Sequence, residues 1–333
     1  MGAEIVRYCV SIGRPVRACT RSGVFDAAAV LGDDTLAAAT VPWSSPLLTY
    51  ATADVTGPDD KLAAAVAGAG MVIFAATAPA NGVPEEVDHL GLVKTAEACI
   101  AANVPRLVIV SGAGVTKTQS QAYWFLNMFG GRMDAKVAGE DAVRAMYHHR
   151  NQKNRNNRAD AAAAATREGE GEGEGDDDGV VDDDCSYVVV RPSGLLDGAA
   201  KGPGALAVNQ GDEAAGFINR ADVAACCVEA GDAANTRGVT FEVYDAGTAV
   251  ATATLSIADI LSDPKLAAIV SLVTGQTWRR WWMKRVSRTT RDGESHQEEG
   301  DGIYVNFTAR ERRGVDYPSL FDSLRPDDDE YDV

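Results

Sequence analysis

The chain has 333 residues, is 46% apolar and carries a formal net charge of −17. Ten of its acids lie in Glu168–Asp184 and five in 326–333, so the rest of the chain has a net charge of −2. This composition predicts a globular protein of one large or two small domains and excludes a membrane-spanning segment, because no apolar run is long enough. Acidity confined to two segments says little about a partner.

Metal and disulfide chemistry are not indicated. The six cysteines form no C-x-x-C pair, and most of them lie in apolar helix or strand patterns. They predict reduced, buried thiols in an intracellular protein. Of the four histidines, His148 and His149 stand beside a polar tract. We therefore expect no metal site.

The first half of the chain alternates between helical and strand-like runs. Strands are indicated by continuous apolar residues and helices by amphipathic stretches. The expected elements are a helix over Ala3–Ser11, strands over Pro15–Arg21 and Leu47–Val55, a helix over 59–69 with Asp59 as its cap, a strand over Met71–Thr77, a helix over Glu85–Val104, a strand over Arg106–Gly112 and a helix over Lys136–His148.

The same alternation continues to residue 245. A strand is expected over Ser186–Leu195, a helix over Arg220–Gly231 and a strand over Thr240–Asp245. The strands are continuous Val/Ile runs, which predicts that they are covered on both faces. Alternating strands and helices predict an α/β fold with a doubly wound parallel sheet.

A low-complexity tract interrupts this pattern at 150–184. It has a basic half, an alanine run and an acidic, glycine-rich half. Such a composition does not bury enough apolar surface to order a chain. We expect a disordered surface insertion within one domain, since loop closure entropy grows slowly with length.

Five stretches, in the correct order, resemble the atypical short-chain dehydrogenase/reductase superfamily in its NmrA-like, NAD(P)-binding branch. They are RPVRACTR, ADVTGPDDKLAAAVAGAGMVIFAA, VDHLGLVKTAEACIAANVPRLVIVSGAG, YVVVRPSGLL and GFINRADVAACCVEA. The resemblance implies a Rossmann-type NAD(P)-binding domain over 1–247. It leaves 248–333 as a small C-terminal lobe with an acidic tail.

The resemblance also implies that something is missing at the start. Family members begin with a strand and a G-x-x-G-x-x-G loop, which places the first helix against the cofactor pyrophosphate. Gly2 stands where the last of these glycines would be. We therefore expect an N-terminally truncated gene model or a partner-dependent fragment. The alternative is that the tail supplies a replacement strand.

The resemblance places cofactor-binding residues at the ends of the strands. Arg21 would meet the adenosine 2′-phosphate and favour NADP over NAD, because a guanidinium suits a phosphate. The alternative is a surface arginine at a strand end. The other residues that the resemblance assigns to the cofactor are Gly2, Asp54, Val55, Ala75, Ala76, Thr77, Ser111, Lys136, Pro192, Ser193 and Gly194.

Catalytic residues are only partly present. Ser111 and Lys136 match the family's catalytic serine and lysine, but Arg132 occupies the position of the tyrosine four residues before that lysine. Tyr123 would replace this proton donor only if its loop folds back. The leading function is an NAD(P)-dependent reductase that passes hydride to a small carbonyl or enone. The alternative is a regulatory or assembly protein that binds NADP without turnover.

The remaining expectations concern partners and location. The segment Trp278–Arg291 mixes tryptophans with basic residues, but we expect it to line the substrate lobe rather than bind nucleic acid or a membrane. The substrate is a small molecule of unknown identity, and a homodimer or another protein partner stays open. The location is cytoplasmic by default. A plastid stays open, because a truncated N-terminus would hide a transit peptide.

Overall fold

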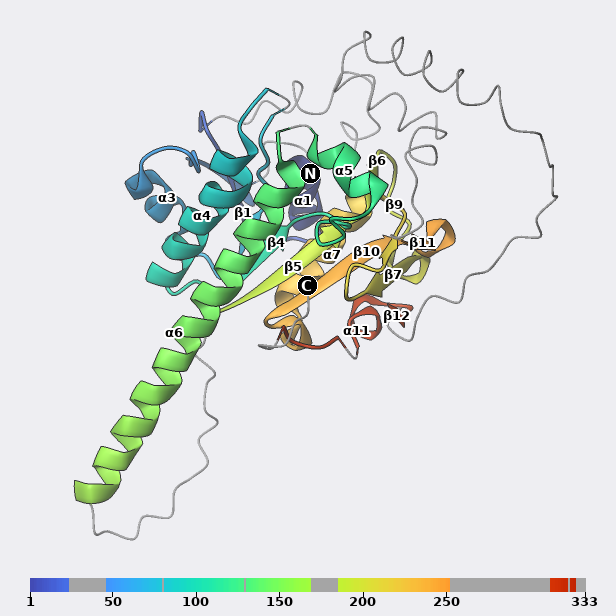
Figure 1. The fold of residues 1–333 in the computed structure, drawn as a ribbon. Coiled ribbons are helices and arrows are strands. Elements are labelled where there is room, and N and C mark those ends of the chain that lie inside the picture. Colours follow the sequence, from blue (N-terminus) through green and yellow to red (C-terminus); the bar gives the residue numbers. More distant parts are fainter. Residues whose placement is uncertain are drawn as a thin grey trace, which may run out of the picture.

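The computed structural model of this chain describes residues 1–23, 46–79, 81–128, 130–168, 185–251, 312–322 and 324–327 (Figure 1). The tryptophan-rich segment Trp278–Arg291 lies outside these residues. Among the residues described, no helix combines the length and the apolar character that a membrane crossing requires.

A six-stranded sheet forms the centre of the molecule, with the strand order β12-β7-β10-β5-β4-β3 (Figure 1). The strands β3, β4, β5 and β10 are parallel, as predicted, whereas β7 and β12 add an antiparallel edge. The sheet is therefore mixed. Its strands are β3 (Val72–Phe74), β4 (Arg106–Val110), β5 (Ser186–Pro192), β7 (Leu206–Asn209), β10 (Val239–Asp245) and β12 (Arg312–Arg313).

Two further strands, β1 (Val16–Thr20) and β2 (Leu48–Thr52), pair in parallel as a separate sheet. Within the described ranges β1 pairs only with β2, and β3 pairs only with β4. The first described element is α1 (Gly2–Ser11). The expectation of a missing first strand stays a prediction.

Helices cover both faces of the sheet. Neighbouring residues of a strand point to opposite faces, so each strand contributes apolar side chains to both layers of the core. On one face, Val108 and Val188 pack with α1 and with α7 (Arg220–Asp232). On the other face, Leu107 and Val189 pack with α4 (Leu90–Ala101) and α6 (Arg132–Glu168). The double covering explains why the strand sequences are continuous apolar runs.

The remaining described elements are short. β6 pairs in parallel with β9, and β8 pairs with β11 in antiparallel fashion. Their bounds are α3 (Asp59–Val66), η2 (Glu85–His89), α5 (Gln121–Asn127), β6 (Gly194–Leu196), η3 (Pro203–Ala205), β8 (Ala214–Ala215), β9 (Phe217–Asn219), η4 (Ala234–Thr236), η5 (Ala246–Thr248), β11 (Val250–Ala251) and α11 (Tyr317–Leu320). Asp59 is the first residue of α3 rather than its cap, which is Pro58.

Helix α6 is much longer than predicted. It continues through the tract expected to be disordered and ends at Glu168, so that its far half projects from the body of the molecule (Figure 1). The expectation of disorder is therefore wrong for 150–168. Alanine, arginine, lysine and glutamine have high helix propensity, and a helix already nucleated at Arg132 extends through them without burying a face. The acidic remainder, 169–184, lies outside the described residues.

Residues 312–322 and 324–327 pack against the central sheet. β12 pairs with β7, and Leu320, Phe321 and Leu324 belong to the core between the sheet, α1 and α7. A boundary at residue 247 therefore does not separate this part of the predicted C-terminal lobe from the Rossmann-like core.

Candidate active site

A buried carboxylate, Asp88, organises the carboxyl edge of the sheet next to β3. Its Oδ1 accepts a hydrogen bond from Thr77 Oγ1 at 2.7 Å and lies 2.9 Å from Lys136 Nζ. Its Oδ2 accepts a hydrogen bond from the backbone N–H of Ala78 at 2.9 Å. Asp88 is 2% exposed, so a charge here requires partners of this kind. Lys136 is thereby fixed at the end of the strand.

Arg132 joins this arrangement from the first turn of α6. Its Nη1 donates to Thr77 Oγ1 at 2.6 Å and to the Ala78 carbonyl at 2.8 Å. Arg132 and Lys136 are four residues apart and lie on one face of the helix. We refer to Thr77, Asp88, Arg132 and Lys136 as the Asp88 cluster.

Two serine hydroxyls lie buried at the ends of the next two strands. Ser111 follows β4 and Ser193 follows β5. Neither Oγ makes a hydrogen bond within normal geometric limits, although Ser111 is close enough to Glu140 to help lower that residue's pKa. Buried hydroxyls of this kind usually have partners. Two buried hydroxyls without a hydrogen-bond partner fit a site that binds a polar group of a ligand.

Tyr123 does not reach Lys136 as a proton donor would. Its hydroxyl donates to Asp134, and its backbone N–H is capped by Ser120 Oγ at 3.0 Å. Burial, followed by the hydrogen bond to Asp134, raises the pKa of Tyr123 to about 12. A catalytic tyrosine needs the opposite shift, so the loop does not supply a substitute donor in this arrangement.

A network of buried ion pairs between α6, β5 and β10 lies next to the site. Arg191 Nη2 donates to Glu140 Oε2 at 2.6 Å, and Arg144 Nη2 donates to the same oxygen at 2.8 Å. Although burial acts to raise it, these two guanidinium groups hold the pKa of Glu140 below its usual value. Glu242, 3.4 Å from Arg191, has a pKa raised to about 8, chiefly by burial and then by the charge of Asp212.

Asp212 fixes the loop that follows Ser111. Its carboxylate accepts hydrogen bonds from Gly114 N and, at 2.9 Å each, from Thr116 N and Oγ1. Asp212 is fully buried and has a φ of 58°, a left-handed conformation that aspartate tolerates better than most residues. The loop beside the serine is therefore held rigidly.

The predicted adenosine residues lie at the ends of β1 and β2. Asp54 accepts hydrogen bonds from Thr56 N at 3.0 Å and Oγ1 at 2.8 Å. These bonds, and to a smaller extent the charge of Arg21, lower the pKa of Asp54. Arg21 is exposed at the end of β1, where it is accessible to a ligand.

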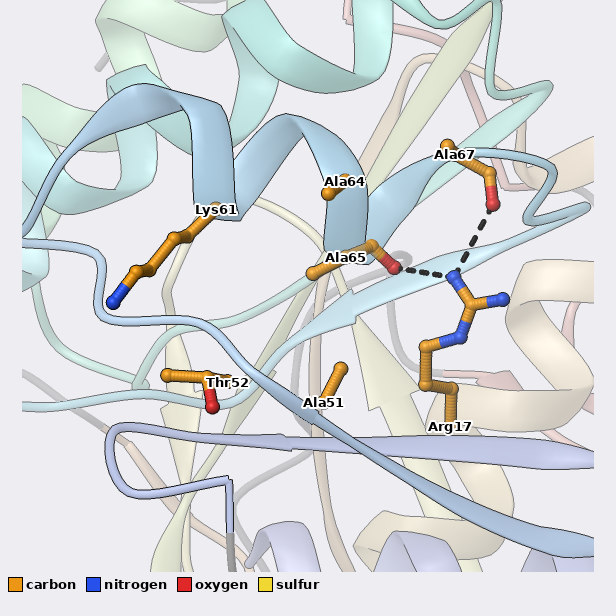
Figure 2. Close-up of a pocket in the computed structure, with 7 residues that line it drawn as sticks. All are labelled: Arg17, Ala51, Thr52, Lys61, Ala64, Ala65 and Ala67. Carbon is orange, nitrogen blue, oxygen red and sulfur yellow. Dashed lines mark hydrogen bonds between the residues drawn. The ribbon is translucent and has the colours of Figure 1, made fainter.

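A cavity of about 510 Å³ lies between α3 and the β1–β2 pair (Figure 2). Arg17 is held at its edge, where Nη1 donates to the carbonyls of Ala65 at 2.8 Å and Ala67 at 3.2 Å. The guanidinium thus satisfies the last carbonyls of α3. Alanines and Thr52 make up much of the remaining wall, so the hollow arises from small side chains.

The other predicted cofactor residues differ in how they pack against the rest of the protein. Ala75 and Ala76 pack against the two main cores, and Val55 contacts Gly91, where a Cβ would lie 2.7 Å from Val55 Cγ2. Gly2 is in the first turn of α1, and a Cβ there would meet nothing within 4 Å. No close approach to another described part of the chain therefore requires glycine at position 2.

Pro192 and Gly194 are part of the strand framework. The Pro192 carbonyl accepts a hydrogen bond from Ala113 N at 3.0 Å, and Gly194 N donates to the Gly216 carbonyl at 2.9 Å. A Cβ at Gly194 would lie 2.7 Å from the ring of Phe217. Glycine is needed here for packing within the protein.

Comparison with known proteins finds a family that matches the first half of the chain. Residues 15–149 match the family described as NAD(P)H-binding. This part of the chain is therefore similar to NAD(P)H-binding proteins. The match ends inside α6, so it includes the whole Asp88 cluster.

The curated relative that the chain matches is an uncharacterised chloroplastic protein of Arabidopsis thaliana, 32% identical over 152 residues. The alignment covers 43% of this chain and 50% of the relative. The chain thus spans about half the length of the curated relative that it matches.

Solved structures share the fold. The oxidoreductase ylbE of Lactococcus lactis is 15% identical, covers 74% of this chain and 87% of its own, and has a TM-score of 0.50. The anaerobilin reductase ChuY of Escherichia coli O157:H7 is 20% identical, with 74% and 91% covered and a TM-score of 0.48. A short-chain dehydrogenase/reductase of Veillonella parvula, solved with NADP, is 13% identical, with 74% and 90% covered and a TM-score of 0.46.

The family resemblance pointed to Thr77 and Lys136 but not to Asp88 or to the contacts that Arg132 makes. Asp88 is buried although it lies in the polar run Glu85–His89, so the local sequence carried no signal for its role. Asp212 carried no signal, because its partners are about a hundred residues away in the sequence. No group of three or more His, Cys, Asp or Glu side chains in the described ranges is arranged to hold a metal ion.

Proposed function

We propose that this chain is a reductase that binds NADP(H) along the carboxyl edge of its sheet and acts on a small carbonyl or enone. The observation that carries the proposal is the fixed Lys136–Asp88 pair, 2.9 Å apart, with the buried hydroxyls of Ser111 and Ser193 at the same edge of the sheet. Ligands of doubly wound folds bind at this edge. The match of 15–149 to the NAD(P)H-binding family supports the same location.

The residues present fit the adenosine and nicotinamide ends of the cofactor. Arg21 would hold the adenosine phosphate, and Asp54 would lie beside the adenosine. Lys136 and Ser111 would hold the nicotinamide ribose and amide, with Ser193 at the same edge. The nicotinamide supplies or accepts a hydride when it is bound. The preference for NADP over NAD rests on Arg21, since this arginine stands directly after β1, where an acid would hold a ribose diol.

Arg132 determines which reactions the site supports. A guanidinium remains charged at neutral pH, so it does not donate a proton in the manner of a phenol. It does stabilise negative charge that develops on a substrate oxygen. Only its Nη1 has described protein partners, which leaves Nε and Nη2 for a substrate. Reduction of an enone suits this arrangement, because the protein stabilises an enolate that then takes its proton from water.

One observation favours the alternative of NADP binding without turnover. Tyr123 donates to Asp134 and has a pKa raised to about 12. Tyr123 is therefore not an acid matched to neutral pH. Under this alternative, the same residues bind the cofactor and a partner protein reads whether it is present.

Fluorescence titration of the folded chain with NADPH and NADH tests the proposal. We expect saturable binding that is tighter for NADPH, and we expect Arg21→Gln to remove this preference. Lys136→Ala should weaken both cofactors by about tenfold, since charged hydrogen bonds contribute about 1.5–3 kcal/mol. Lys153→Ala, on the exposed part of α6, is the matched control. An absence of binding by folded protein contradicts the proposal.

Turnover then separates the two functions. NADPH oxidation should be followed with a panel of small enones and aldehydes. Oxidation that depends on substrate supports the reductase. Tight NADPH binding without oxidation by any of them supports the non-catalytic alternative.

A further inference from the structure

A row of polar side chains crosses four neighbouring strands, β7, β10, β5 and β4, on the face of the sheet that α6 covers (Figure 1). Asn209 of β7 is paired with Glu242 of β10, and Glu242 is paired with Arg191 of β5. Ser111, directly after β4, continues the row, because its N–H donates to the Val190 carbonyl at 2.9 Å. Paired residues of adjacent strands point to the same face of a sheet. The row therefore leads from β7 to a serine of the proposed cofactor site.

Two acceptor atoms in this row have no hydrogen-bond donor among the described residues. They are Glu242 Oε2 and Asn209 Oδ1, which belong to residues that are 0% and 2% exposed and stand opposite each other. Burying two such oxygens without a donor is unfavourable. One proton on Glu242 satisfies both of them, because Oε2–H then donates to Asn209 Oδ1.

The charges around Glu242 favour this proton. The adjacent cation, Arg191, binds Glu140 more closely, since Nη2 lies 2.6 Å from Glu140 Oε2 and Nη1 lies 3.4 Å from Glu242 Oε1. Asp212, in the loop after β7, is a further buried carboxylate. Burial first and the charge of Asp212 second raise the pKa of Glu242 to about 8, against the opposing effect of Arg191. Glu242 is therefore protonated at neutral pH.

A reversed amide at Asn209 is the alternative that this charge balance opposes. Its Nδ2 would then donate to an ionised Glu242. Arg191 would have to serve two buried carboxylates, Glu242 and Glu140, with the charge of Asp212 close by. A protonated Glu242 leaves Arg191 to Glu140.

Glu140 connects the row to the site. Its Oε2 accepts hydrogen bonds from Arg191 and from Arg144, which also binds Thr240 Oγ1 at 2.9 Å. Ser111 lies close enough to help lower the pKa of Glu140, although its Oγ makes no hydrogen bond within normal limits. While both guanidinium groups remain with Glu140, the Ser111 hydroxyl is available to a ligand. An ionised Glu242 competes for Arg191, and Ser111 is then the nearby donor that replaces it.

We propose that protonated Glu242 is a positioning residue for the NADP(H) site and acts on it through Arg191 and Ser111. This inference rests on the proposed function. The hydrogen bond from Glu242 to Asn209 keeps Arg191 on Glu140, so that Ser111 presents its hydroxyl to the nicotinamide end of the cofactor. Loss of the proton draws Arg191 toward Glu242 and turns the Ser111 hydroxyl toward Glu140. Cofactor binding is thereby linked to a proton on a side chain that does not touch the cofactor.

Fluorescence titration with NADPH between pH 7 and pH 9 tests this role. The Kd of the wild-type chain should rise about tenfold over this range, because the protonated fraction of a group with a pKa of about 8 falls by about that factor. Glu242→Gln keeps a neutral donor for Asn209 and should bind with a Kd that does not change with pH. Ser111→Ala should weaken binding at pH 7 and lose most of the rise. Glu97→Gln, an exposed α4 residue, is the matched control and should keep it.

Carbon-13 NMR of the Glu242 carboxyl gives a second readout, which does not depend on how a variant folds. The resonance is assigned by its absence in Glu242→Gln. We expect it to titrate near pH 8 without NADPH and at higher pH with saturating NADPH, because the linkage between the proton and the cofactor is reciprocal.

Three results would overturn the inference while leaving NADPH binding at pH 7 intact. They are a Glu242 carboxyl that is ionised at pH 7, as the reversed Asn209 amide requires, a wild-type Kd that does not change with pH, and a rise in Kd that Glu242→Gln retains in full. An absence of NADPH binding at every pH, by folded wild-type chain and folded Glu242→Gln alike, contradicts the proposed function and the positioning role together.

Discussion

Arg132 and Lys136 reach different partners although they lie on the same face of α6. Lys136 pairs with the buried Asp88, and Arg132 binds Thr77 and the Ala78 carbonyl. A helical spacing of four residues brings both cations to the end of β3. The charge of Lys136 is balanced inside the protein, whereas Arg132 retains donors for a ligand. At the residue scale, Arg132 is therefore the side chain that distinguishes this site.

Replacing Arg132 with alanine should separate chemistry from cofactor binding. We expect Arg132→Ala to lower kcat by about a hundredfold, because a donor that stabilises developing charge contributes about 2.7–4 kcal/mol. The Kd for NADPH should change by less than about threefold, since the cofactor contacts are assigned to other residues. Steady-state kinetics and NADPH titration measure the two effects. Equal loss of kcat and NADPH affinity would assign Arg132 to the cofactor instead.

Tyr123 should be dispensable for turnover. Its hydroxyl is engaged by Asp134, and its pKa is raised to about 12. We expect Tyr123→Phe to keep kcat within about twofold at every pH between 6 and 9, because a phenol with this pKa is a poor acid at neutral pH. A kcat lowered tenfold in folded Tyr123→Phe protein would restore Tyr123 as the proton donor.

Glu242 should make stability depend on pH. Its pKa is raised from 4.5 to about 8 in the folded chain, mainly by burial. Between these values the folded state binds more protons than the unfolded state, so the free energy of unfolding should fall as pH rises from about 4.5 to about 8. Urea unfolding of Glu242→Gln should show a flatter pH dependence over this window. An unchanged slope would contradict the assignment.

Glu140, in the same network, has a lowered pKa, and its effect on the pH dependence of stability is opposite to that of Glu242. It accepts hydrogen bonds from Arg144 and Arg191, and its pKa is lowered. Its contribution to stability is present above the pKa of the unfolded chain and is lost as pH falls through the folded pKa. Glu140→Gln should lower the free energy of unfolding at pH 7 by about 3–5 kcal/mol, because it leaves buried guanidinium charge uncompensated.

At the scale of elements, α6 combines a packed half with an exposed half. Val143 and Tyr147 are buried against the sheet, whereas residues 156–161 are exposed. The packed half is stabilised by tertiary contacts and the exposed half mainly by its own propensity. This division explains why the amphipathic pattern indicated a helix only as far as His148.

The exposed half of α6 should therefore unfold independently. We expect Asn157→Pro to reduce the helical signal in far-UV circular dichroism while the Tm of the core changes by less than about 2 °C, since proline disrupts a helix locally by about 3 kcal/mol. Asn157→Ala is the matched control and should raise the helical signal. A large fall in Tm for the proline variant would show that the projecting half supports the core.

At the scale of the whole molecule, the C-terminal residues complete the fold. Asp327 is bound by Thr240 N at 3.0 Å, by Tyr187 Oη at 3.1 Å and by Arg144 Nε at 3.1 Å. Leu320, Phe321 and Leu324 add to the core on one face of the sheet. Segments more than 80 residues apart in the sequence are thus joined at the amino end of β10.

Neutralising Asp327 should weaken this connection. We expect Asp327→Asn to lower the free energy of unfolding by about 2 kcal/mol, less than for an isolated buried pair, because Arg144 keeps Glu140 and Asp141 as partners. Urea unfolding at pH 7 measures the change. Asp322→Asn, at an exposed position, is the control and should have little effect. Equal stability of both variants would show that Asp327 does not anchor the chain.

The sequence by itself determined the elements with strong local patterns. The apolar runs at Arg106–Val110 and Ser186–Pro192 had to be buried on both faces, and this requirement predicted the parallel core of the sheet. Resemblance to a known family added the lysine and serine positions. Both kinds of information are carried by residues that are close together in the chain.

Only the tertiary structure decided the features that depend on distant residues. β7 and β12 join the sheet through pairing, and their short sequences carry little pattern of their own. The partners of Asp88, Asp212 and Glu140 lie on other elements, so their charges acquire a role only after folding. Packing likewise decided which part of α6 is buried against the sheet and which part is exposed. The physical reason is that burial and charge pairing are properties of positions in space, which local sequence periodicity does not record.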